Sequence, residues 1–246
     1  MEKDLPTVVI VPGFWESATG VFDETVAKLQ EQGLEVVVAE LRSTGHGSSE
    51  GITLDDDIIA VRGYIDPLVS EGREVVIAGH SAGGFIGSSA VEALTRKSRI
   101  EAGKPGGVVA FAFICAGVFP LGFTTGPLPC FDIQGEHLYC ANALTNLFND
   151  LSGQDARFWD ARLRPQPASK WDAEIRFTGY EGVKCHYLVC QQDQLLPTAL
   201  QLQFAATAQA EVTTCDAGHM VMLSQLDTLL KFLFQVIEKT TTKHDL

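Results

Sequence analysis

The stretch that most constrains the fold runs from Val75 to Gly84 and reads Val-Val-Ile-Ala-Gly-His-Ser-Ala-Gly-Gly. An apolar, β-branched run suited to a buried strand ends at a glycine, and a helix-compatible segment, Phe85–Leu94, follows. The spacing therefore predicts a strand, a sharp turn and a helix, with Ser81 at the apex of the turn. Gly79 and Gly83, two residues before and after the serine, leave room for strand and helix to pack closely. A serine presented in this way is a candidate nucleophile.

The rest of the chain alternates strand-like and helical runs. Such alternation predicts an α/β fold, with a mostly parallel sheet of about six strands covered by helices on both faces. A first helix should begin after Ser17 or Thr19 and end at Gly33, and a second should run from a capping Thr53 to about Glu71. The expected strands cover 7–11, 35–39, 75–78, 108–115, 185–190 and 211–215. Ligands bind such sheets at the carboxyl ends of the strands, so site residues are expected there.

Residues 119–177 interrupt this alternation. They are rich in proline, glycine and aromatic residues and contain only weak helical pieces, at 144–151 and 154–162, with no strand pattern. So long an excursion within a compact domain is usually functional. We therefore predict a single domain over residues 1–246, in which residues 119–177, called the insert below, form a small cap over the site. A peripheral decoration is the alternative.

Charge and length limit the partners and the compartment. The 246 residues carry a formal net charge of −13, which argues against nucleic acid and anionic membrane surfaces as partners. The chain starts with a polar segment, Met1–Pro6, and shows neither a signal-like apolar region nor a run long enough to span a bilayer. These features predict a cytoplasmic protein with a small-molecule substrate. The oligomeric state stays open, with a homodimer among the options.

The six cysteines do not follow a metal-binding pattern. They lack Cys-x-x-Cys and mixed Cys/His zinc spacing, so no metal is expected. Four of them lie in or beside apolar strand-like runs, where a thiol behaves as a small buried hydrophobe. Whether Cys130 and Cys140 pair is left open, although a reducing compartment disfavours a disulfide.

A serine hydroxyl needs a base to accept its proton and an acid to orient that base. His219 follows the last expected strand and Asp193 follows the strand before it, so both should lie at the same sheet edge as Ser81. Asp216 is an alternative acid because it is close to His219 in sequence. The other histidines lie in less suitable places, namely within the turn (His80), inside a strand (His186), in a glycine-flanked loop (His46), in the insert (His137) and in the tail (His244).

Four short motifs of the chain resemble those of a known protein family. They are Val9–Phe14 (Val-Ile-Val-Pro-Gly-Phe), Gly79–Gly84 (Gly-His-Ser-Ala-Gly-Gly), Gln192–Pro197 (Gln-Asp-Gln-Leu-Leu-Pro) and Gly218–Ser224 (Gly-His-Met-Val-Met-Leu-Ser). Over nearly its whole length the chain resembles the α/β-hydrolase superfamily. It is most similar to the compact branch that contains plant methylesterases, hydroxynitrile lyases and microbial hydrolases. The insert, around Leu147–Leu151 and Arg162–Gln166, resembles caps of bacterial and fungal members.

The resemblance implies roles for particular residues. In this superfamily the nucleophile, acid and histidine occur in that chain order, which favours Asp193 over Asp216 as the partner of His219. The oxyanion hole takes one backbone N–H from the residue after the nucleophile, Ala82, and a second from the loop after the first strand, where Phe14 is the expected donor. Chemistry of this kind needs no metal or organic cofactor.

The branch contains esterases and lyases, and two positions favour ester hydrolysis. Its hydroxynitrile lyases carry a lysine directly after the catalytic histidine and a threonine in the oxyanion loop, whereas this chain has Met220 and Gly13 there. We therefore expect a serine carboxylesterase that acts on a small, mostly apolar ester through an acyl-enzyme. A lyase or isomerase that uses His219 as a general base stays open, as does a receptor-like ligand-binding protein. The expected substrate pocket is lined by Gly13, Trp15, Leu121, Phe123, Phe131, Trp159 and Met220.

Overall fold

The computed structural model describes residues 5–169 and 171–241 and contains the expected parallel sheet. Its six strands follow the order β2-β1-β3-β4-β8-β9, and every neighbouring pair is parallel. The α/β-hydrolase fold predicted from the sequence is confirmed. The strands are β1 (Thr7–Val11), β2 (Val36–Val38), β3 (Glu74–His80), β4 (Gly107–Ile114), β8 (Lys184–Cys190) and β9 (Glu211–Cys215).

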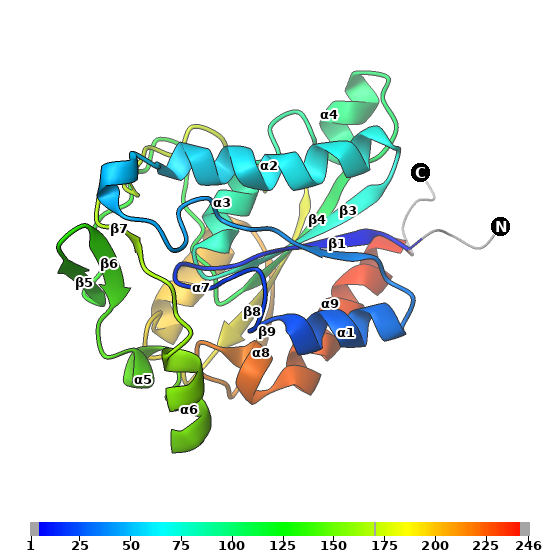
Figure 1. Ribbon diagram of the computed structural model, residues 1–246. Helices are drawn as coiled ribbons and strands as arrows, with labels where there is room; N and C mark the ends of the chain where they lie inside the picture. The colour runs from blue at the N-terminus through cyan, green and yellow to red at the C-terminus, as the bar shows by residue number, and fades with distance from the viewer. Residues whose placement is uncertain (1–4, 170, 242–246) are drawn as a thin grey trace.

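Helices cover both faces of this sheet (Figure 1). The helices α2 and α3 pack on one face, while α1 and α9 pack on the other and touch each other. The helices are α1 (Asp23–Glu31), α2 (Leu54–Ser70), α3 (Gly83–Ser89), α4 (Arg96–Glu101), α7 (Thr198–Thr207), α8 (Val221–Ser224) and α9 (Leu226–Thr241), with a short 3₁₀ turn, η1 (Ser48–Glu50). Within the described ranges, no helix is both long and apolar enough to cross a membrane.

Two helix boundaries differ from the expectation for physical reasons. Helix α1 begins at Asp23, later than a cap at Ser17 or Thr19 would place it, because the Asp23 carboxylate accepts the Gly20 N–H and sets the first turn there. The helix after the turn ends at Ser89, and the separate helix α4 starts behind Thr95, whose hydroxyl accepts the Ser98 N–H.

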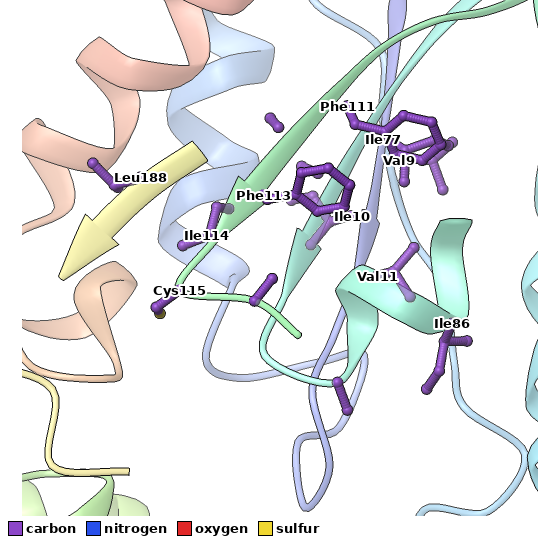
Figure 2. Packing of buried hydrophobic residues seen from close by; sticks show 14 of the residues in the cluster. Val9, Ile10, Val11, Ile77, Ile86, Phe111, Phe113, Ile114, Cys115 and Leu188 are labelled. Atoms are coloured by element: carbon purple, nitrogen blue, oxygen red, sulfur yellow. The ribbon is translucent and has the colours of Figure 1, made fainter. Parts of the chain in front are cut away.

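The core next to the turn is built from in-register rows of apolar side chains. Val9 of β1 lies beside Ile77 of β3, which in turn lies beside Phe111 of β4. Figure 2 shows these three side chains gathered on one side of the sheet, and all of them are buried. A parallel strand that is covered on both faces needs a continuous run of buried residues, and these strands supply β-branched and aromatic ones. The rigid sheet therefore fixes where the carboxyl ends of β1, β3 and β4 lie.

The insert contains strands that the sequence analysis did not predict. Residues 131–140 form an antiparallel hairpin that a short third strand extends, so the expectation of a non-strand excursion was wrong. A two-residue turn with Gly135 at positive φ closes this hairpin, a geometry that glycine adopts readily. Its elements are β5 (Phe131–Gln134), β6 (His137–Cys140), α5 (Ala143–Asn146), α6 (Gly153–Asp160) and β7 (Gln166–Pro167).

The insert lies beyond the carboxyl end of β1, at the left of Figure 1. Cys130 and Cys140 flank its hairpin as free thiols, and the other four cysteines are free and buried.

Candidate active site

Ser81 sits on a strained turn that close backbone packing enforces. Its φ is +51°, a left-handed conformation that costs free energy in a residue with a side chain and is typical of functional turns. A Cβ on Gly83 would lie 2.0 Å from the carbonyl oxygen of Val11, and a Cβ on Gly79 would lie 2.8 Å from that of Gly83. Glycine at these two positions is therefore a steric requirement of the turn.

His219 and Asp193 form a buried pair at the same edge of the sheet. His219 Nδ1 lies 2.7 Å from Asp193 Oδ2, and the two residues are 1% and 4% exposed. Asp193 Oδ1 accepts the N–H groups of Leu195 and Leu196, at 2.8 and 2.9 Å. These bonds stabilise the ionised carboxylate and leave its second oxygen for the imidazole. An acid that binds Nδ1 directs Nε2 of the ring to act as the base.

Gln201 completes the support of this acid, and the sequence analysis did not single it out. Its side chain is fully buried and donates from Nε2 to Asp193 Oδ2 at 3.3 Å and to the Leu196 carbonyl at 2.6 Å. Its Oε1 accepts the Cys190 N–H at the end of β8. Asp216, the alternative acid, instead accepts a hydrogen bond from Gln192 at the surface.

His80, the residue directly before Ser81, binds the main chain of His219 at the turn. His80 Nε2 donates to the main-chain carbonyl of His219 at 2.9 Å, and the centroids of the two rings are 4.8 Å apart. The Cys115 thiol donates to the same carbonyl at 3.3 Å. Two side chains from the ends of β3 and β4 therefore fix the backbone that carries the histidine.

The same three residues bring potential metal ligands close together. One donor atom each of His80, Cys115 and His219 lies within 4.8 Å of the others. Two of these side chains are already committed as donors to the His219 carbonyl, and Nδ1 of His219 is bound to Asp193. A metal ligand needs a free lone pair, so the arrangement suits a hydrogen-bond network better than an ion.

The loop after β1 packs directly on the serine. A Cβ on Gly13 would lie 2.7 Å from the Cβ of Ser81, so only glycine fits there. Within residues 5–169 and 171–241, the N–H groups of Phe14 and Ala82 do not donate to any protein acceptor. Two free donors beside a serine are what an oxyanion hole requires. Trp15, with φ of +68°, is bound to the insert through its indole N–H, which donates to the Leu138 carbonyl at 3.0 Å.

A cavity of about 450 Å³ opens at Ser81 and runs along α7. Its lining within the described residues contains no acidic, basic or histidine side chain, so it suits an uncharged apolar ligand. The cavity wall carries an aromatic cluster in which Phe119 stacks on Phe123, with centroids 4.6 Å apart, and meets Phe204 edge-on. On α7 the lining residues are Leu200, Gln203, Phe204 and Thr207, which share one helix face.

The structure distributes the expected pocket residues over several places. Trp15, Phe123 and Phe131 line this cavity together with Ser81, and Gly13 adjoins it. Leu121 is 63% exposed to solvent, Trp159 lines a separate hollow beside Gly20, and Met220 is fully buried in the core.

Two insert residues bind the loops that carry the acid and the histidine. Asp150 Oδ2 accepts the Gly218 N–H at 2.6 Å, directly before His219. Asn149 donates to the carbonyl of Gln192 at 2.9 Å, directly before Asp193. Neither role could be predicted from the sequence, because the contacts join segments more than 40 residues apart and no local pattern marks them.

Comparisons with known proteins agree with this fold. The profile described as "Alpha/beta hydrolase family" matches residues 8–231. Alpha/beta hydrolase nvfD of Aspergillus novofumigatus is 26% identical over 241 residues, covering 93% of this chain and 95% of the relative. A curated protein of Phoma sp., "Probable hydrolase R7", is 23% identical over 227 residues, covering 87% of this chain and 91% of the relative.

A solved structure shares the fold over nearly the entire chain. Tomato methylketone synthase I complexed with 2-tridecanone superimposes with a TM-score of 0.77 at 16% identity, covering 97% of this chain and 100% of the other. At such low identity the likeness concerns the fold.

Proposed function

The chain belongs to the alpha/beta hydrolase family, and we propose that it is a serine hydrolase of the carboxylesterase type that cleaves a neutral, mostly apolar ester. One observation carries the proposal. Ser81 stands in a strained turn at the end of a large apolar cavity, and a buried histidine–carboxylate pair lies beside that turn. A serine that borders a cavity, with an oriented histidine whose main chain is bound by the residue before that serine, fits acyl transfer.

The proposed reaction uses five groups of the chain. Ser81 Oγ attacks the ester carbonyl carbon while Nε2 of His219 accepts the hydroxyl proton, and Asp193 stabilises the imidazolium. The N–H groups of Phe14 and Ala82 donate to the oxyanion, each contributing about 3 kcal/mol to the stability of the transition state. His219 then protonates the leaving alcohol, and a water molecule repeats the sequence to release the acid from Ser81.

The cavity lining supports the proposed substrate class. A carboxylate or ammonium group in this cavity would lose its hydration without gaining a charged partner, which costs several kcal/mol. An aliphatic or aromatic substituent would instead replace water against the rings of Phe119 and Phe204. We therefore infer that neutral p-nitrophenyl esters are hydrolysed faster than a p-nitrophenyl ester that ends in a free carboxylate.

Loss of the nucleophile tests the mechanism. We expect Ser81→Ala to lower the kcat for p-nitrophenyl hexanoate by at least about 10⁴-fold, because the acyl-enzyme can no longer form. Ser70→Ala, which changes a surface serine on α2, is the control and should keep wild-type activity. A fluorophosphonate probe followed by mass spectrometry should find its adduct on Ser81.

The same experiment separates the rival activities. A wild-type protein that turns over a substrate while Ser81 stays unlabelled would indicate a lyase or isomerase with His219 as its base. A protein that is neither labelled nor active, yet binds apolar ligands, would indicate a receptor-like role. Either result would overturn the esterase proposal.

A further inference from the structure

A buried acid–base pair that the proposed mechanism does not use lies beneath the serine turn. Glu16 is 3% exposed and His80 is fully buried, and Glu16 Oε1 lies 2.8 Å from His80 Nδ1. Burying two ionisable groups costs several kcal/mol, and apolar side chains of similar volume would avoid that cost. A pair kept in the core at this cost is expected to hold other segments of the chain in place.

The contacts of His80 bear on the protonation of its two ring nitrogens. His80 Nε2 faces the His219 carbonyl, which can only accept, so this nitrogen carries a hydrogen. Nδ1 lies 2.8 Å from the Glu16 carboxylate oxygen, close enough for an ion pair when the ring is protonated. Burial disfavours the charged ring, but the Glu16 carboxylate outweighs it and raises the pKa of His80.

The pair connects three segments that the proposed reaction needs. Glu16 Oε2 accepts the Gly13 N–H at 2.7 Å and so closes the loop that contains Phe14. His80 is the residue directly before Ser81, and its ring holds the carbonyl of His219. The same loop contains Trp15 at positive φ, a conformation that persists only where surrounding contacts hold it. A single carboxylate–imidazole unit therefore reaches the oxyanion loop, the nucleophile turn and the histidine loop.

We propose that Glu16 and His80 form a positioning pair that keeps the Phe14 N–H and His219 in register around Ser81. The inference rests on the proposed esterase function and adds the device that aligns its parts. Neither side chain needs to touch the substrate. The pair acts through the Gly13–Glu16 and His80–His219 hydrogen bonds and the 2.8 Å contact between Glu16 and His80, so the length of the acidic side chain matters more than its charge.

Two substitutions at residue 16 separate the effect of side-chain length from the effect of side-chain charge. Glu16→Gln keeps the length: its carbonyl oxygen can accept the Gly13 N–H, and its amide can donate to Nδ1 of a neutral His80. Glu16→Asp keeps the charge but is one methylene shorter, so it cannot reach both partners. We expect the kcat for p-nitrophenyl acetate to stay within about threefold of wild type in Glu16→Gln and to fall at least about tenfold in Glu16→Asp. KM should change less than kcat in both, because neither Glu16 nor His80 lines the cavity.

A second histidine–glutamate pair in the same sheet is the matched control. His186 Nδ1 lies 3.5 Å from Glu211 Oε2, near the amino ends of β8 and β9. Glu211→Gln and Glu211→Asp should both keep wild-type kcat. Circular dichroism and thermal unfolding show whether each variant is folded before its kinetics are compared.

The outcomes are distinct. A kcat within twofold of wild type in Glu16→Asp, or a lower kcat in Glu16→Gln than in Glu16→Asp, would overturn the positioning role. If wild-type protein is inactive on esters and unlabelled at Ser81, the proposed function fails first. If wild type is active and both residue-16 variants match it, only the positioning pair fails.

Discussion

The site joins two regions that are built in different ways. At the rim, meaning the strand ends that carry Ser81, Asp193 and His219, side chains are held by directional hydrogen bonds of 2.6–3.3 Å. At the wall, meaning the cavity lining around Phe119 and Phe204, side chains meet through ring contacts with centroids 4.6–5.4 Å apart. The rim therefore depends on particular atoms, whereas the wall depends on volume and apolarity.

This difference indicates how each region responds to substitution. A hydrogen bond lost at the rim leaves a buried polar group unpaired and moves an atom of the proposed reaction, so we expect a large effect on rate. A changed ring at the wall alters the space available to a ligand, so the effect depends on the ligand.

The largest effect is expected at the acid of the rim. Asp193→Asn keeps the shape of the side chain but offers a donor to His219 Nδ1, which favours the wrong tautomer. We expect the kcat for p-nitrophenyl hexanoate to fall about 10⁴-fold, by analogy with such changes in serine hydrolases of other folds. Asp216→Asn is the matched control, because that acid binds Gln192 at the surface and should leave kcat within twofold. If the two variants lose activity equally, Asp193 is not the orienting acid.

The sequence predicted most of the rim because its residues obey local rules. The glycines around Ser81 follow from the steric demand of the turn, and Asp193 and His219 follow strands of a parallel sheet whose carboxyl ends must meet. The supports of the rim could not be predicted in the same way. Glu16 reaches His80 across 64 positions of the chain, and no local pattern encodes such a contact.

The wall and the insert were harder to predict for a related reason. A stretch rich in aromatic residues does not show which ring faces a cavity, so Phe123 lines it whereas Leu121 faces solvent. The hairpin of residues 131–140 mixes polar and apolar residues, which weakens the alternation that marks a strand. Its turn at Gly135 was the available signal.

A smaller, substrate-dependent effect is expected at the wall. Phe204→Trp adds volume opposite Phe119, so we expect kcat/KM for p-nitrophenyl hexanoate to fall about tenfold while that for the acetate stays within twofold. Leu202→Trp is the control, since this residue lies on the same helix but is 44% exposed and should change neither value. If kcat/KM fell equally for both esters, the substitution at residue 204 would be disturbing the rim and not the space available to the substrate.

Directional hydrogen bonds also occur away from the rim, in a buried polar cluster that joins helix α2 to the insert. Asp57 of α2 is buried, and its carboxylate accepts the Ser43 N–H at 2.7 Å. Ser43 Oγ lies 2.6 Å from Asp57 Oδ2 and 2.5 Å from Gln166 Oε1, in strand β7 of the insert. One hydroxyl hydrogen cannot serve two acceptors, but a proton on Asp57 lets the carboxyl donate to Ser43 and Ser43 donate to Gln166. Burial raises the pKa of Asp57 to about 6.

The smallest effect on activity, and a clear one on stability, is therefore expected from Asp57→Asn. The folded state holds the Asp57 proton to higher pH than the unfolded chain, so this group's contribution to the free energy of unfolding falls as pH rises from about 4 to about 6. The free energy of unfolding of the wild type, less that of Asp57→Asn, should therefore drop by up to about 3 kcal/mol between these pH values. Above that range the difference should stay constant. Urea unfolding at several pH values measures this difference, with Asp66→Asn, at a partly exposed position of the same helix, as control. A difference that does not vary with pH would mean that Asp57 is already ionised in the folded protein, and that ordinary charge-assisted bonds hold the insert.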